Sequence, residues 1–97
     1  MKLRLARRAA QDLLEISDYL SVRNPEAARR IRDAIFATLQ NLTMFPKAGR
    51  IQNVEGIRKV VTGKYSYIVY YMIDEGADEI SIVAIQHSAR KRDFSDD

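Results

Sequence analysis

Few residue types in this sequence could do chemistry, and the first of them is its single histidine, His87. Histidine exchanges protons near neutral pH without strong perturbation, so His87 is the candidate for acid–base work. A histidine at the end of a strand can equally bond locally and help to terminate the sheet. One histidine without clustered carboxylates cannot build a zinc site, and nothing in the sequence indicates a metal or organic cofactor. The absence of cysteine excludes disulfides, thiolate metal sites and a cysteine nucleophile.

Positive charge is the second feature with chemical meaning, and it is unevenly distributed within a net charge of +3. Residues 46–70 contain a single acidic residue, Glu55, and the basic residues Lys47, Arg50, Arg58, Lys59 and Lys64. A further basic cluster, Arg90-Lys91-Arg92, stands before the acidic end of the chain. If the two clusters meet in space, they form one positive surface that favours polyanions or an acidic protein. The alternative is that these side chains only solvate one face and a flexible tail.

Length and composition limit the architecture that must carry these residues. A chain of 97 residues is one domain, and it can bury a single core without disulfides. No apolar run approaches the ~20 residues of a membrane span. The stretch from Met1 to Ala6 is too short and too charged for a secretory signal. We therefore expect a cytoplasmic protein that makes no membrane contact.

Two helices are predicted in the first half of the chain. Their apolar positions recur at spacings of three and four, as on one helix face: Ala9, Leu13, Ile16 and Leu20, widened by Ala10 and Leu14, and then Ala28, Ile31, Ile35, Leu39 and Leu42. Between them, Asn24 can cap the second helix, Pro25 suits its first turn, and Glu26 lies near its positive end. Phe45-Pro46 ends the second helix. The two helices form an antiparallel hairpin.

Strands are predicted on either side of this hairpin. Residues 2–5 alternate polar and apolar side chains, whereas residues 46–56 have the composition of a loop. Strands follow at Ile57–Thr62, Tyr67–Ile73 and Ile80–Ile85. The middle strand has no polar interruption, so both of its faces should be covered, with Tyr67 and Tyr71 on one face and Tyr70 on the other. The sequence therefore predicts an α+β domain of order β-α-α-β-β-β, an antiparallel sheet with a helical hairpin on one face.

Four short blocks, in order, resemble the toxins of the RelE/ParE superfamily. They are Pro46-Lys47-Ala48-Gly49-Arg50, Gly56-Ile57-Arg58, Tyr65 to Tyr71, and Ile85-Gln86-His87-Ser88-Ala89-Arg90. The element order matches as well, and the resemblance covers essentially the whole chain. It implies the toxin of a type II toxin–antitoxin, or plasmid stabilisation, system that inhibits growth until a cognate antitoxin binds it in a hetero-oligomeric complex.

The RelE-like branch of this superfamily implies an endoribonuclease that cuts mRNA on the ribosome. Its chemistry needs a base for the ribose 2′-OH, cations for the phosphorane charge and an acid for the leaving oxygen. By resemblance, Arg58, His87 and Arg90 are the candidate catalytic residues. The usual arginine early in the aromatic strand is replaced by Tyr67, and Ser88 stands where an aromatic residue often follows the histidine.

The Gly56-Ile57-Arg58 block, the run from Tyr67 to Tyr71 and the histidine near the end of the last strand resemble the ParE-like branch more closely. Members of this branch generally lack the nuclease residues and act by binding DNA gyrase. On this interpretation the protein is not an enzyme, and the target-binding residues are Arg50, Arg58 and the cluster Arg90-Lys91-Arg92. Arg50 could instead anchor its loop to a helix carboxylate such as Asp12 or Glu15. Arg58 should point to the same side as Val60 and Thr62, by strand alternation.

The antitoxin contact is predicted beside the helices, where a groove could accept an added helix or strand. The candidate residues are Ala28, Ile31 and Arg50. Glutamate at Ala28 or Ile31 would leave folding intact only if those side chains were exposed in the free protein.

Overall fold

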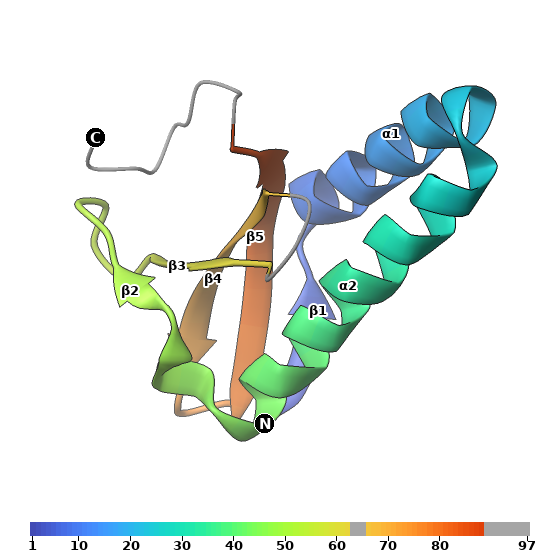
Figure 1. The fold of residues 1–97 in the computed structure, drawn as a ribbon. Helices are drawn as coiled ribbons and strands as arrows, with labels where there is room; N and C mark the ends of the chain where they lie inside the picture. Colours follow the sequence, from blue (N-terminus) through green and yellow to red (C-terminus); the bar gives the residue numbers. More distant parts are fainter. Residues whose placement is uncertain (63–65, 89–97) are drawn as a thin grey trace.

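The computed structural model describes residues 1–62 and 66–88 (Figure 1). Its elements, in chain order, are β1 (Lys2–Leu5), α1 (Arg7–Arg23), α2 (Pro25–Met44), the 3-10 turn η1 (Pro46–Ala48), β2 (Arg50–Ile51), β3 (Arg58–Val61), β4 (Tyr67–Asp74) and β5 (Glu79–His87). The α+β class and the order of the main elements are confirmed. The expected loop at 46–56 differs, because it contains η1 and the short strand β2.

The helical hairpin forms as its sequence signals indicate. The Asn24 side chain accepts a hydrogen bond from the Ala27 amide at 3.1 Å, which satisfies one of the free N–H groups at the start of α2. At the end of α1, the Arg23 guanidinium lies 3.7 Å from the centre of the Tyr19 ring and bonds the Tyr19 carbonyl at 2.9 Å. These contacts cover the tip of the hairpin, which extends away from the sheet (Figure 1). Among the described residues, no helix combines the length and apolar character that a bilayer crossing requires.

The sheet has the strand order β1-β5-β4-β3-β2. The pairs β2–β3, β3–β4 and β4–β5 are antiparallel, as expected for a meander. The pair β1–β5 is parallel, so the sheet is mixed, and the expectation of a wholly antiparallel sheet does not hold for this pair. Alternation in residues 2–5 identified a strand but carried no information on its partner, which is set by the path of the chain through both helices.

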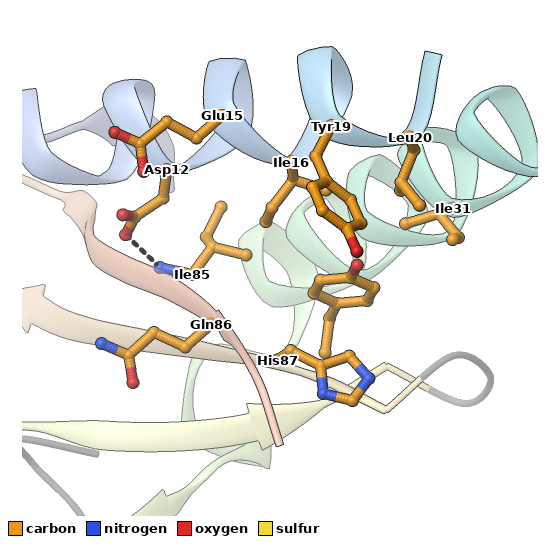
Figure 2. Close-up of a pocket in the computed structure, with 10 residues that line it drawn as sticks. Asp12, Glu15, Ile16, Tyr19, Leu20, Ile31, Ile85, Gln86 and His87 are labelled. Carbon is orange, nitrogen blue, oxygen red and sulfur yellow. Dashed lines mark hydrogen bonds between the residues drawn. The ribbon is translucent and has the colours of Figure 1, made fainter. Parts of the chain in front are cut away.

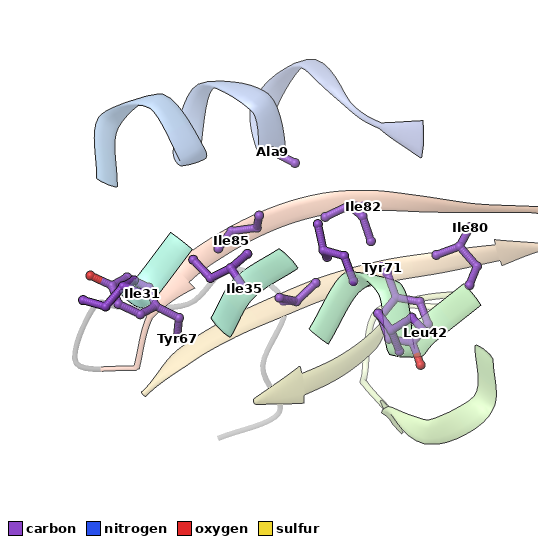
Figure 3. Packing of buried hydrophobic residues seen from close by; sticks show 11 residues of the cluster. Ala9, Ile31, Ile35, Leu42, Tyr67, Tyr71, Ile80, Ile82 and Ile85 are labelled. Atoms are coloured by element: carbon purple, nitrogen blue, oxygen red, sulfur yellow. The ribbon is translucent and has the colours of Figure 1, made fainter. Parts of the chain in front are cut away.

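Strand β4 is buried on both faces, as predicted. Toward the helices lies the larger core (Figure 3), which contains Tyr67 and Tyr71 together with α2 residues such as Ile35 and β5 residues such as Ile82. On the opposite face, Tyr70 packs in a smaller cluster with Ile57, Ile68 and Ala84. Full burial of one such side chain stabilises the fold by about 1.5–3 kcal/mol, so the double coverage of β4 makes it the centre of the domain.

The segment after α2 is attached to this centre through Tyr71. The buried Tyr71 hydroxyl donates a hydrogen bond to the Pro46 carbonyl at 2.6 Å and accepts one from the Gly49 amide at 2.8 Å. Only glycine permits this approach, because a Cβ at position 49 would lie 2.6 Å from the Tyr71 hydroxyl and 2.9 Å from the Lys59 carbonyl. The aromatic strand therefore fixes the path by which the chain reaches β2.

We expect Gly49→Ala to lower the free energy of unfolding by about 1–3 kcal/mol, because the added methyl group must displace either the tyrosine or the β3 backbone. Chemical denaturation of the purified protein measures this change. Gly76→Ala is the matched control, since its Cβ would meet only the Asp74 carboxylate at an ordinary 3.5 Å. Equal stability of the two variants would contradict the role given to Gly49.

Candidate functional site

His87 is the last residue of β5 and its side chain is exposed. It stands opposite Tyr67 in the register of β4 and β5. The two rings meet edge to face, with centres 5.2 Å apart and planes at 89°. The strand-end position predicted for His87 is confirmed, and its ring is held against a tyrosine.

His87 borders a pocket of about 630 Å³ between the helical hairpin and the ends of β4 and β5 (Figure 2). The apolar part of the lining is Ile16, Leu20, Ile31 and Ile85, and the polar part is Asp12, Glu15, Tyr19, Tyr67, Gln86 and His87. Asp12 reaches from α1 to the sheet, where its carboxylate accepts a hydrogen bond from the Ile85 amide at 2.9 Å. This amide lies beyond the end of β1 pairing, so α1 takes over from β1 along the edge of β5.

The hydroxyl of Tyr67 cannot serve as a cation or as a base in this pocket. Burial raises the pKa of Tyr67 above its usual value, and the nearby Tyr19 raises it further. Tyr67 is therefore neutral at physiological pH, so it can donate a hydrogen bond but cannot stabilise phosphorane charge as an arginine would.

The Arg58 side chain is turned toward the segment after α2. Its guanidinium Nη1 bonds the carbonyl of Gly49 at 2.8 Å and that of Lys47 at 3.5 Å. Arg58 pairs with Tyr71, whereas His87 pairs with Tyr67, four positions along the same strand. Four residues of strand span about 13 Å, so the structure does not bring Arg58 and His87 to one phosphate. Arg58 does lie on the side of Val60, which packs against the helix-facing core.

Arg50 lies at the opposite edge of the sheet from the helix carboxylates. It is exposed in β2 and stands opposite Lys59. Three strand spacings, about 14 Å, separate β2 from β5, whose edge Asp12 occupies. The alternative that Arg50 anchors its loop to Asp12 or Glu15 is therefore not realised. The remaining predicted target-binding residues, Arg90, Lys91 and Arg92, lie outside the described residues.

The predicted antitoxin residues Ala28 and Ile31 are buried, with 6% and 7% of their surfaces exposed. As core residues of the hairpin they do not offer free side chains to a partner. Ala28 does line a groove of about 480 Å³ whose other residues are Leu5, Ala10, Leu13, Leu14, Ile16, Ser17, Arg32, Ile35 and Phe36. The accessible part of this groove is formed by Leu14 and Phe36, which are 60% and 46% exposed.

Sequence reasoning misplaced Leu14 and missed Phe36. Leu14 was assigned to the widened core face of α1, yet it projects into the groove. Phe36 directly follows the core residue Ile35, and an aromatic residue one position off the buried face is the signal that could have identified it. Among residues 1–62 and 66–88, no group of three or more metal-binding side chains is gathered.

Known proteins resemble the chain in both sequence and fold. A family model described as "ParE toxin of type II toxin-antitoxin system, parDE" matches residues 3–92. A Sinorhizobium fredii protein named "Putative toxin Y4kP" is 28% identical over 87 residues, which are 90% of this chain and 88% of that protein. A chain of the chromosomal ParDE system from P. aeruginosa superposes with a TM-score of 0.77 at 28% identity, covering 90% of this chain and 95% of that one. The isolated E. coli RelE toxin shares the fold, with a TM-score of 0.64 at 11% identity, and the match covers 94% of this chain and 87% of that one.

The raised pKa of Tyr67 predicts a loss of stability in alkali. The unfolded chain releases the tyrosine proton near pH ~10, before the folded protein does, so stability is complete below that pH and falls as pH rises toward the folded pKa. We expect Tyr67→Phe to reduce this slope. Urea unfolding between about pH 8 and about pH 11 measures it, and an unchanged slope in the variant would contradict the assignment.

Proposed function

Because the chain belongs to the ParE toxin family of type II toxin–antitoxin systems, we propose that it inhibits growth by binding DNA gyrase and that a cognate antitoxin neutralises it. On this proposal the protein acts in the cytoplasm, where gyrase and the antitoxin would meet it. On this proposal the protein makes and breaks no covalent bond of its target. Its exposed cations and grooves act only in recognition.

One observation carries this proposal over RNA cleavage: the described candidates for catalysis are dispersed. His87 stands at the end of β5 against a neutral tyrosine, whereas Arg58 bonds the Gly49 carbonyl about four residues farther along the sheet. In-line attack on a phosphate requires the base and the charge-stabilising cations around one group of atoms. A surface that only binds has no such requirement.

The alternative function is that of a ribosome-dependent mRNA endoribonuclease. The observation that favours it is the exposed imidazole of His87 at the border of a pocket whose lining includes two tyrosines and two carboxylates. Such a ring could move a proton if the ribosome, or another part of this chain, supplied the positive charges that a bound RNA phosphate needs.

One experiment separates the two functions. We expect induction of the protein in growing cells to inhibit supercoiling of a reporter plasmid while transcripts remain intact, with His87→Ala equally toxic. Plasmid topology on chloroquine gels and transcript integrity by primer extension are followed in the same culture. Rapid cleavage of transcripts at ribosome-bound codons, abolished by His87→Ala, would establish the endoribonuclease in place of the gyrase inhibitor.

The antitoxin contact is proposed at the groove beside Leu14 and Phe36. The E. coli RelBE and Mycobacterium tuberculosis RelBE2 structures that share this fold are toxin–antitoxin complexes, which supports an antitoxin as the partner. The exposed leucine and phenylalanine suit the apolar face of an amphipathic helix, and Arg32 in the lining suits an acidic residue on that helix. Arg50 lies at the far edge of the sheet from this groove, so we propose it as a contact of the target and no longer of the antitoxin.

Glutamate at Leu14 or Phe36 should weaken antitoxin binding by about tenfold or more, because a charge would face the apolar side of the partner. Both side chains are exposed, so the melting temperature should change little. Affinity for the cognate antitoxin is measured by titration calorimetry. Val22→Glu is the control, since Val22 is 84% exposed and lies outside the groove. If all three variants bind like the wild type, the antitoxin docks elsewhere.

A further inference from the structure

Two cations stand directly opposite one another at the edge of the sheet. Arg50 of β2 and Lys59 of β3 are cross-strand partners in an antiparallel pair. Lys59 in turn pairs with Tyr70, which packs on the face away from the helices. Directly opposed residues project to the same side of a sheet, so both cations lie on the face opposite the helical hairpin. Their Cβ atoms are about 4.5–5.5 Å apart in such a pair.

The neighbouring residues hold this pair in place. Gly49, next to Arg50, is fixed by the Tyr71 hydroxyl on its amide and by the Arg58 guanidinium on its carbonyl. On the other side of Arg50, the side-chain Nε2 of Gln52 donates a hydrogen bond to the Arg50 carbonyl at 2.9 Å. The backbone amide of Gln52 donates one to the Ile57 carbonyl at 2.9 Å. A strand of two residues is therefore anchored at both ends. Such anchoring fixes the backbone positions from which the two cationic side chains project.

No carboxylate in the described part of the chain neutralises the pair. The ion pair observed there joins Arg30 and Glu26 on α2, far from β2, and neither Arg50 nor Lys59 takes part in one. Like charges directly opposite each other on adjacent strands destabilise a sheet. Within the described residues, the fold thus keeps two cations on opposed backbone positions without a carboxylate partner, at some loss of stability.

We propose that Arg50 and Lys59 form the anion-binding centre of the target surface and that they receive carboxylates of an acidic patch on the target protein. This inference rests on the proposed function, which makes the target a protein. Two exposed aliphatic side chains lie on the same face as the pair: Val61, two residues after Lys59 in β3, and Met72, two residues after Tyr70 in β4. Apolar groups among charges suit a protein interface, whereas a nucleic-acid backbone is met by polar and basic groups.

The pair has a signature in which stability and function move in opposite directions. Arg50→Gln and Lys59→Gln each remove the repulsion, so each should raise the melting temperature by roughly 1–4 °C. The same variants should weaken inhibition of gyrase supercoiling by roughly tenfold, and the potency of the wild type should fall with added salt more steeply than theirs.

Arg4→Gln is the matched control, because it removes one exposed positive charge from β1, at the opposite edge of the sheet, where the cross-strand partner is Ser81. It should change neither the melting temperature nor the potency. The inference would be overturned if the wild type inhibits gyrase and Arg50→Gln and Lys59→Gln are as potent as Arg4→Gln. The proposed function would then still stand. A wild-type protein that does not inhibit gyrase would overturn both.

Binding to a short DNA duplex by fluorescence anisotropy tests the kind of partner. We expect the wild type and Arg50→Gln to bind the duplex alone equally weakly. Loss of duplex affinity in Arg50→Gln, parallel to its loss of potency, would show that the pair contacts phosphates and would overturn the assignment to a protein surface.

Discussion

The hydroxyl of Tyr71 joins the centre of the sheet to the segment through which the chain passes from α2 to the sheet edge. It is buried, and its pKa is raised by that burial, while the Gly49 amide and the charge of Arg58 act in the opposite direction. The hydroxyl therefore remains a neutral donor to Pro46 and an acceptor from Gly49 at physiological pH. Strand β2 contains two residues and pairs with β3 at only two positions. Its position therefore depends more on the hydrogen bonds of the Tyr71 hydroxyl than on strand pairing.

The double burial of β4 divides the molecule into regions with different chemistry. On the helix side, the hairpin leaves a pocket near His87, which carries two carboxylates, and an apolar groove beside Leu14 and Phe36. On the opposite side lie Arg50 of β2, which is exposed, and Lys59 of β3, which is half-buried. These regions face different directions, so one protein could hold an antitoxin at its helices and a target at its sheet edge. On the proposed function, the antitoxin would then neutralise the toxin by steric exclusion of the target or by a conformational change. It would not compete with the target for the same side chains.

The sequence predicted the elements far better than their surfaces. Periodic apolar positions located both helices, and the capping residues around Asn24 located their junction, since these signals are local. The partner of β1 could not be predicted, because it depends on where two helices return the chain. Nor could the sequence show that the Arg58 side chain bonds the Gly49 carbonyl, nine residues earlier in the chain, and its contact with the target stays a prediction. Ala28 and Ile31 were correctly placed on the apolar face of α2, but whether such a face is core or groove depends on how tightly the hairpin packs.

The central claim is that this toxin acts by binding gyrase, and isothermal titration of the purified protein into purified gyrase tests it most directly. The account predicts saturable heat with a fixed stoichiometry in the absence of DNA and nucleotide, and an affinity that weakens as salt is added. An absence of heat with gyrase, together with cleavage of mRNA on purified ribosomes by the same preparation, would contradict it.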